Sequence, residues 1–486
     1  MITAPMHEIA VLVLGIVVLM WESFAPTTDK RVVALLAIVG LALILAASFH
    51  LQPPHPPSTS GLWSFYAADP LAIFFKRFVL IATIFVLIMT IDYAPVVRAA
   101  VPGMTPQAGL GELFTLPIFT CAGLMYLVSA IDLVMVFVSL ELVTISFYVL
   151  ISLTRRNPVS LEAGVKYLIL SAMSTGFIVY GITWIFGVTG QTNLERIGAA
   201  LNSAGIDRNA ALFGMLLVLV GLGFKIAAVP FQLWVPDVYQ GAPTPVTAYL
   251  SVGSKAAGFV VLLRVLQPFV NLPGVGKLLV VLALLTLVYG NLAALPQTNL
   301  KRLLAYSSIA HAGYLLVGVA CVDGRAVAFY LVAYLLMTLL SFAVLVIVAQ
   351  HTGERIEDFD GLSQRSPFLA FAMLIAMASL AGVPLTAGFF GKFLIFMSAV
   401  AQQQTALIVV GTITVGCGFY YYLKVVRAMY WQPATNTERI PISGLSRFAM
   451  IILILGTIYL GVYPKPILKA LEPKSGPVMV TSTATP

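Results

Sequence analysis

Charged side chains and cysteines are scarce in this chain of 486 residues. Only 9% of the residues are charged, whereas soluble domains carry roughly 25%. The three cysteines stand singly in apolar runs, with no CxxC or Cys/His spacing, so we expect neither a disulfide framework nor a metal or iron–sulfur centre. No Walker loop or haem-ligand pair occurs, and the GLGFKI string at Gly221 lacks the third glycine of a dinucleotide loop. We therefore expect no cofactor, no metal and no nucleotide hydrolysis in this chain itself.

Long apolar runs fill most of the sequence. Hydrophobic residues make up 60% of it, and runs of about 18 residues, enough for a helix to cross a bilayer, recur throughout. The first run, from His7 to Phe24, follows no basic residue and precedes no small-residue cleavage site, so we expect a retained span rather than a signal peptide. The pattern predicts an all-α polytopic membrane protein of about fourteen transmembrane helices. Their expected starts lie near His7, Arg31, Leu71, Leu113, Leu133, Glu162, Ala210, Thr244, Val275, Lys301, Ala326, Pro367, Ala406 and Phe448.

The basic residues are distributed as expected for a membrane topology. The formal net charge is +8, but lysine and arginine are spread over short loops and form no cluster that would bind nucleic acid. Few lie in the loops on one side of the predicted spans: Arg196, Arg208, Lys277 and Arg325. Many more lie on the other side, among them Lys30, Arg31, Lys301, Arg302, Arg355 and Arg365. The positive-inside rule makes the second side cytoplasmic and places both termini on the outer, periplasmic side. Counting Lys76 and Arg77, inside the third span, would reduce the difference in basic residues between the two sides but would not reverse it.

Two of the predicted spans contain helix breakers. The seventh includes Pro230 and Pro236, and the twelfth includes Pro384 among several glycines. Because proline removes a backbone hydrogen bond and clashes with the preceding turn, we expect each span to form two half-helices. Similar strings, AAVPFQLW and AGVPLTAGF, surround the two breaks. An odd offset of five spans inverts the orientation, so spans 4–8 and 9–13 are predicted to form two inverted five-helix repeats, with transport sites at the broken helices.

We expect a single transmembrane domain over residues 1–486, because no connection between spans is long enough for a soluble domain. Within it, residues 1–110 hold the three N-terminal spans, 111–268 the first repeat and 269–432 the second repeat. Residues 433–486 hold the last span and a short polar tail after Pro464.

Four charged side chains fall deep inside the apolar spans: Glu141, Lys225, Lys255 and Lys392. A charge in hydrocarbon costs several kcal/mol or more, so such residues persist only in a protein interior or hydrated cavity, where they usually carry ions or protons. Burial penalises the ammonium form of lysine and a nearby carboxylate favours it, so a movement of Glu141 relative to Lys225 would switch proton affinity. Because Lys225 precedes the break, we also expect carbonyl groups freed there, together with water, to hydrate it. A static ion pair that only fixes packing is the alternative.

Further polar residues accompany these charges. His311, in SSIAHAGYLL, lies well inside a span, where it serves as a proton relay or bridges two helices by hydrogen bonds. Glu162 and Lys166 are four residues apart on one helix face, which predicts an ion pair that is structural or lies at a proton entrance. Asp237, just past the first break, is expected to cap a half-helix or bind a neighbour.

The chain resembles the antiporter-like membrane subunits of respiratory complex I, the proton-pumping NADH:quinone oxidoreductase. The strings that carry the resemblance include LELVTISFYVL, EAGVKYLILSA, GFKIAAVPFQLWVPDVYQGAPTPVTAYLSVGSKAAGF, NLKRLLAYSSIAHAGYLL and SLAGVPLTAGFFGKF, across spans five to twelve. Subunit M typically has glutamate where this chain has Lys392, and subunit L continues into a lateral helix and extra spans. The resemblance is therefore closest to subunit N.

The resemblance implies fourteen helices with two inverted repeats, a half-channel from the cytoplasm through the first repeat and another to the outside through the second. It assigns proton translocation to Glu141, Lys225, Lys255 and Lys392, matched to the family positions in spans five, seven, eight and twelve. It also implies partners, namely the antiporter-like subunit M and the small subunits K and J, in a bacterial cell inner membrane. FMN, iron–sulfur clusters and quinone would then belong to partner subunits of this translocating enzyme.

One departure and two alternatives remain open. The superfamily often places a histidine soon after the seventh-span proline, whereas this chain has Gln232, which argues against a relay through that position. A subunit of a multisubunit sodium/proton antiporter shares the lysine and proline pattern and is the alternative within transport. A structural membrane spacer whose charges only fix packing is the alternative outside transport.

Overall fold

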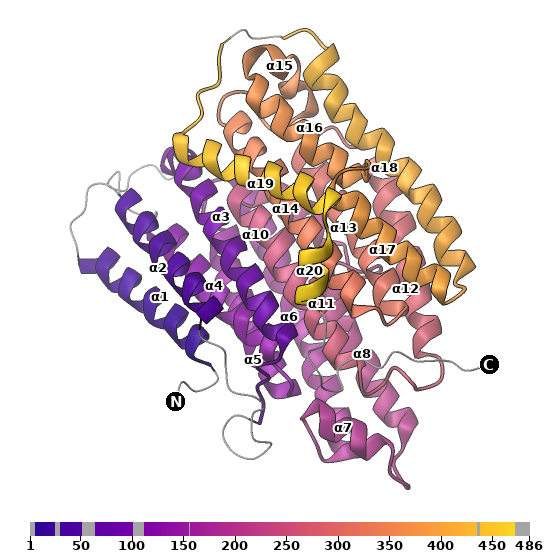
Figure 1. Ribbon diagram of the computed structural model, residues 1–486. Coiled ribbons are helices and arrows are strands. Elements are labelled where there is room, and N and C mark those ends of the chain that lie inside the picture. The colour runs from indigo at the N-terminus through magenta and orange to yellow at the C-terminus, as the bar shows by residue number, and fades with distance from the viewer. Residues whose placement is uncertain are drawn as a thin grey trace.

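The computed structural model describes residues 5–24, 30–50, 64–100, 111–154, 156–434 and 438–471, and almost all of them are helical (Figure 1). Thirteen helices in these ranges are long and apolar enough to cross a membrane. Two shorter apolar helices, α16 (Pro367–Ala381) and α17 (Ala387–Ala401), follow each other across a break and make one further crossing. The prediction of an all-α multi-pass protein with about fourteen spans is confirmed.

The crossings begin close to the predicted residues. The first eight are α1 (Met6–Phe24), α2 (Arg31–His50), α3 (Pro70–Ala100), α4 (Gly111–Ser129), α5 (Leu133–Ile151), α6 (Pro158–Thr189), α8 (Arg208–Ile226) followed by α9 (Trp234–Gly241), and α10 (Thr244–Tyr249) continuing into α11 (Lys255–Leu266). The others are α12 (Val275–Ala294), α13 (Leu300–Ala320), α14 (Gly324–Ala349), α16 with α17, α18 (Thr405–Trp431) and α19 (Gly444–Val462).

Polar side chains set the start of several of these helices. Asp132, Asn157 and Asp207 stand immediately before α5, α6 and α8, and each accepts a hydrogen bond from a backbone N–H of the first turn. Asn299 and Asp323 cap α13 and α14 in the same way. Such a cap satisfies a backbone donor that has no partner inside the helix, so the apolar run that follows begins as helix at that residue.

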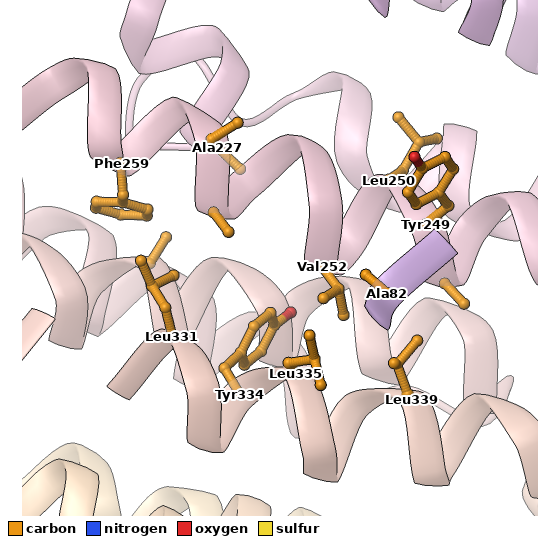
Figure 2. Close-up of a cluster of buried hydrophobic side chains, with 14 of the residues drawn as sticks. Ala82, Ala227, Tyr249, Leu250, Val252, Phe259, Leu331, Tyr334, Leu335 and Leu339 are labelled. Atoms are coloured by element: carbon orange, nitrogen blue, oxygen red, sulfur yellow. The ribbon is translucent and has the colours of Figure 1, made fainter. Parts of the chain in front are cut away.

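The crossings differ in how far the rest of the chain covers them. In the most apolar stretches of α10–α11, α13 and α14, 94%, 94% and 89% of the residues are buried, against 22% in α1. α1 and α2 lie at one lateral edge and α18 at the other, while α19 packs across α14 and α3 (Figure 1). Figure 2 shows the centre, where Tyr249 lies beside Ala82 of α3 and Tyr334 of α14 faces the span-eight segment. Lys255 and His311 thus lie on the most enclosed helices.

Both predicted breaks are present. α8 ends where Ala227 takes a left-handed conformation (φ 65°, ψ 37°), and the chain becomes helical again only in α9. α16 ends where Gly382 is left-handed (φ 93°, ψ 43°), and α17 follows. A left-handed residue turns the chain away from the helix axis and ends the helix. The broken helices of spans seven and twelve are therefore confirmed.

A third irregularity was not predicted. Leu250–Ser254 form a π-helical turn between α10 and α11, directly before Lys255. Turns of this kind are rare, and they are frequently found where an α-helix passes a functional site.

Short helices occupy the loops. α7 (Leu194–Leu201) lies at one end of the bundle, and the 3₁₀ helix η2 (Ile356–Phe359) with α15 (Leu362–Arg365) belongs to the loop after α14; Figure 1 places α7 and α15 at opposite ends. Part of the expected polar tail is helical, as α20 (Lys465–Ala470), and residues 472–486 of that tail lie outside the described residues.

Candidate functional site

The first group of deep charges lies between α5, α6 and α8. Lys225 is 4% exposed, and its Nζ donates hydrogen bonds to Thr144 Oγ1 on α5 at 2.6 Å and to Ser171 Oγ on α6 at 2.8 Å. Glu141 lies one turn before Thr144, and its Oε1 accepts a 2.6 Å hydrogen bond from Thr175, one turn after Ser171. Residues three or four apart share a helix face, so the carboxylate and the ammonium group occupy neighbouring turns of one polar seam.

The structure decides against one alternative and one expectation for Lys225. Among the ion pairs of the described residues, none joins Lys225 to Glu141, so the static pair considered as an alternative is absent. The acceptors of Lys225 are hydroxyl groups rather than carbonyls freed by the break, because α6 packs along α8 and brings Ser171 to the lysine, and α5, packed on α6, supplies Thr144. Hydroxyl groups both donate and accept hydrogen bonds, so they can serve lysine in either protonation state.

Lys255 connects span eight to span ten. It is 2% exposed, and its Nζ donates to the backbone oxygen of Ser308 at 2.5 Å and to Ser308 Oγ at 2.8 Å. The ring of Tyr334 lies 5.8 Å from Nζ, and the Tyr334 hydroxyl is hydrogen-bonded to Ser251 Oγ at 2.7 Å. Lys255 therefore reaches from the predicted first repeat into α13, the second helix of the predicted second repeat.

Ser308, His311 and Tyr314 recur at every third residue and form one polar stripe along α13. His311 is 1% exposed; its Nδ1 is 2.7 Å from the hydroxyl of Tyr330 on α14, and its Nε2 is 3.1 Å from the hydroxyl of Tyr422 on α18. The prediction that His311 bridges helices by hydrogen bonds is thus confirmed. The same geometry suits a relay, because both ring nitrogens face hydroxyl groups that can donate or accept.

Lys392 lies at the second break. It is 5% exposed, and its Nζ donates to the backbone oxygens of Leu380 at 2.9 Å and Ala381 at 2.8 Å. These are among the last carbonyls of α16, which have no partner within their own helix and carry the negative end of its dipole. The ring of Tyr314 is 5.0 Å from Nζ. Freed carbonyls therefore surround the lysine of the second break, not that of the first.

These groups form a row through the centre of the protein. α13 links Lys255, through Ser308, to His311, and Tyr314 one turn further on faces Lys392. α8 packs against α11 next to Lys255, since a Cβ added at Gly258 would lie 3.8 Å from Lys225 Cβ. All five predicted site residues thus lie along one line of neighbouring helices.

A cluster of partly exposed charges also joins the two halves, through α6, α9 and α13. Asp237 of α9 accepts hydrogen bonds from Lys166 of α6 at 2.6 Å and from Arg302 of α13 at 2.8 Å. Lys166 also pairs with Glu162 at 2.7 Å, so the predicted i,i+4 ion pair is confirmed, and Asp237 is found to bind neighbours. The groups are partly exposed, and exposed pairs of this kind contribute little to stability.

Sequence reasoning missed the partners of the buried charges. Thr144, Ser171 and Ser308 carry no distinguishing signal, because hydroxyl residues are common in membrane helices. Their spacing relative to Glu141 and His311 was the only available hint. Lys76, considered above only for topology, is also a buried residue with a partner: it forms an ion pair with Glu8 of α1.

The described residues hold no candidate metal site. In those ranges, no group of three or more histidine, cysteine, aspartate or glutamate side chains is placed to bind a metal ion. Gln232 is 4% exposed, and its Oε1 has no hydrogen-bond partner within the described part of the chain.

Comparisons with known proteins agree with the resemblance. The family described as "NADH:quinone oxidoreductase/Mrp antiporter, TM" matches residues 130–418. NADH-quinone oxidoreductase subunit N of Trichlorobacter lovleyi is 39% identical over 476 residues, which are 96% of this chain and 95% of that protein. A chain of respiratory complex I from Thermus thermophilus is 32% identical with a TM-score of 0.80, covering 95% of this chain and 98% of that one.

A chain of the Mrp complex from Dietzia sp. shares the fold, with a TM-score of 0.82 over 96% of each chain, but is only 20% identical. The resemblance to subunit N predicted from the sequence is therefore confirmed over nearly the whole length. The chain belongs to the NADH:quinone oxidoreductase/Mrp antiporter membrane family, within its group of NADH-quinone oxidoreductase N subunits.

Proposed function

We propose that this chain, as subunit N of a proton-translocating NADH:quinone oxidoreductase, carries protons across the membrane through its row of buried charges. The observation that carries the proposal is the stripe of Ser308, His311 and Tyr314 on α13, which lies between Lys255 at one end and Lys392 at the other. Three ammonium groups at 2–5% exposure cannot be explained as solvated surface charges. Buried ionisable groups of this kind mark proton paths in membrane proteins.

Each residue has a distinct role in this proposal. Glu141 changes the proton affinity of Lys225 when their separation changes, and the hydroxyls of Thr144 and Ser171 hold the lysine in both states. Lys255 passes the proton from the first half to the second, and His311 relays it between tyrosine hydroxyls. Lys392 is the outward station.

The chemistry of the row favours protons over sodium. A sodium site needs oxygen ligands around an open position, whereas here the oxygens next to the deep charges accept hydrogen bonds from ammonium groups. A lysine can gain or lose a proton, but it repels Na⁺. The multisubunit sodium/proton antiporter is the second candidate, because it shares the fold, the matched family and the lysine and proline pattern.

Partner subunits are needed to cover one face of this chain and to supply the redox chemistry. Glu141 is partly exposed at the middle of α5, and Thr175 beside it is partly exposed too. Since a carboxylate facing lipid at that depth is costly, we infer that a neighbouring membrane subunit, such as K, J or M, covers this face. FMN, iron–sulfur clusters and quinone belong to partner subunits, whose redox chemistry drives proton movement from the cytoplasm to the outer side of a bacterial inner membrane. Under the positive-inside rule both termini lie outside.

Substitution of Lys225 tests the proposal. The complete enzyme carrying Lys225→Ala is purified and reconstituted in proteoliposomes, where NADH oxidation and proton uptake are measured together. We expect at least about a tenfold loss of proton pumping, equivalent to about 1.4 kcal/mol, because the proton-binding group of the first half is gone. The matched control is Lys424→Ala, which removes a lysine that donates to a backbone carbonyl, Gln297 O, near the end of α12.

Two outcomes would contradict the proposal. Normal pumping by an intact Lys225→Ala enzyme would assign the buried charges to packing alone. Purification of the chain with antiporter subunits only, without flavin or iron–sulfur partners, would instead support the sodium/proton antiporter.

A further inference from the structure

A buried ion pair lies outside both predicted repeats, in the three N-terminal helices. Lys76, in the second turn of α3, pairs with Glu8, in the first turn of α1, with 2.8 Å between Nζ and Oε1. The side chain of Glu8 is 0% exposed and that of Lys76 is 4% exposed. This pair is as well enclosed as the lysines of the central row.

Tyr66 completes a three-membered cluster. Its hydroxyl donates to Glu8 Oε1 at 2.9 Å and accepts a hydrogen bond from Lys76 Nζ. Burial, together with the Glu8 carboxylate, raises the pKa of the Tyr66 hydroxyl far above its ordinary value, so Tyr66 stays protonated and remains a donor. All these contacts use Oε1; the other oxygen, Oε2, is buried and has no hydrogen-bond partner in the described ranges. The cluster therefore offers one carboxylate oxygen at which a proton can add.

The cluster lies at the end of the bundle that carries α7. Tyr66 forms a β-bridge with Ala130, which directly follows α4. The side chain of Asn193, the residue that caps α7, donates to Ser64 O at 3.0 Å in the same segment. In the proposed orientation this is the outer end.

A hydrogen bond and an ion pair connect α3 and the residue before it to α10 and α11, one on each side of Lys255. Before it, Tyr249 is hydrogen-bonded to Thr83 at 2.7 Å, and Thr83 lies two turns from Lys76 on α3. After it, Arg264 at the end of α11 pairs with Asp69 at 2.7 Å, just before α3 begins.

Both Arg264 of α11 and Lys76 of α3 affect the pKa of Asp69. Burial opposes ionisation of this carboxyl, but the Arg264 guanidinium, the Ala72 amide and the Lys76 ammonium outweigh it and hold its pKa below the ordinary value. Lys76 makes the smallest of these contributions, and Asp69 is in turn the ion-pair partner of Arg264 at the end of α11.

Stability alone does not explain the cluster. A buried ion pair is often no more stabilising than apolar side chains of similar size, because taking both charges out of water costs about as much as their attraction returns. Packing of α1 against α4, and of α4 against α3, by apolar side chains would hold these helices without charges.

We propose that Glu8, Lys76 and Tyr66 form a further proton-binding site, at the outer end of the bundle, which exchanges protons between the Lys255 region and the outside. The proton adds to Glu8 Oε2 and converts the carboxylate to the neutral acid, while Lys76 keeps its charge; release restores the ion pair. The inference rests on the proposed function, because it needs the central row to deliver the proton.

The test uses the complete enzyme with Glu8→Gln and with the double change Glu8→Gln, Lys76→Met. In proteoliposomes we expect both to pump fewer protons per NADH oxidised than the unaltered enzyme. Because the double variant removes both charges, it is expected to assemble normally. Infrared difference spectra of reduced against oxidised enzyme are expected to lose one protonated-carboxyl band in Glu8→Gln.

The chain supplies a matched control on the same helix. Lys30 and Glu22 also form an ion pair, 2.5 Å apart, at the other end of α1. The corresponding double change Glu22→Gln, Lys30→Met is expected to leave the number of protons pumped and the carboxyl bands unchanged.

Full proton stoichiometry in the double variant would overturn the inference and make the pair a packing device. Should the double variant fail to assemble, Tyr66→Phe keeps both charges and removes only the shared hydroxyl; an unshifted carboxyl band there would overturn the inference too. Loss of pumping in Lys225→Ala together with full pumping in the Glu8 and Lys76 variants defeats only this inference. Full pumping in all of them defeats the proposed function as well.

Discussion

Each of the two broken helices holds a buried lysine next to its break, but the lysines are held by different partners. Lys225 belongs to the half-helix before its break and donates to side-chain hydroxyls of α5 and α6. Lys392 belongs to the half-helix after its break and donates to the last backbone carbonyls of α16. Glu141 lies one helical turn along the seam from the contacts of Lys225, whereas the polar contacts of Lys392 in the described residues are carbonyl oxygens.

The difference teaches which lysine is suited to switching. Hydroxyl groups rotate and can donate as well as accept, so they accommodate a charged or a neutral lysine. Backbone carbonyls only accept, and at a helix C-terminus they favour a positive charge. The first break therefore suits a lysine whose proton affinity follows Glu141, and the second suits a lysine held in place by fixed dipoles.

Reversing the charge at the second break is expected to have the largest effect. In Lys392→Glu a carboxylate would face the carbonyl oxygens of Leu380 and Ala381, and an unpaired buried charge of this kind costs roughly 3–5 kcal/mol. We expect the subunit to be lost from the complex, or retained without proton pumping, as measured by subunit content and by proteoliposome assays. The matched control is Lys424→Glu, whose lysine donates to Gln297 O at a half-buried position. Equal behaviour of the two variants would contradict a special role for the fixed carbonyls.

Neutralising Glu141 is expected to have the next largest effect. Glu141→Gln keeps the shape of the side chain and an oxygen for the Thr175 hydroxyl, but it removes the charge that favours a protonated Lys225. A change of about 1.4 kcal/mol in that interaction corresponds to a tenfold change in proton affinity, so we expect about a tenfold loss of pumping in a normally assembled enzyme.

The control for this change is Glu162→Gln, which removes an exposed carboxylate paired with Lys166 and should cost less than about 1 kcal/mol. Undiminished pumping in Glu141→Gln, together with loss in Lys225→Ala, would show that the lysine of the first break works without its carboxylate.

The fold and the deep charges could be predicted because both follow from local rules. A run of about 20 apolar residues has to be a span, and a charge such as Lys255 within it has to be buried in protein. Prolines inside the apolar runs predicted the breaks, because proline disrupts a helix locally. The inverted arrangement of the spans followed from counting them.

The partners of the charges could not be predicted, because they depend on which helix faces touch. Lys225 was expected to meet freed carbonyls, but the side of α8 that carries it packs against hydroxyl residues. Lys76 and Glu8 lie near the ends of their spans, where a charge costs little, so nothing in the sequence separated them from ordinary interface residues. Only the packing of α1, α3 and α4 shows that they are enclosed.

The smallest effects are expected from substituting the left-handed residue at each break, and they test whether the two breaks depend equally on their backbone conformation. Gly382→Ala places a Cβ at φ 93° and 3.1 Å from Lys392 Cδ, so we expect a loss of about 1–2 kcal/mol and weaker pumping as the lysine is displaced. Ala227 already holds φ 65°, so Ala227→Gly relieves that strain but adds freedom to the unfolded chain, for a net change within about 1 kcal/mol. Thermal unfolding of the purified enzyme measures both. Gly416→Ala, on α18 with open space around it, controls for the added methyl group. A larger effect at Ala227 than at Gly382 would mean that the first break, and not the second, depends on a precisely held backbone.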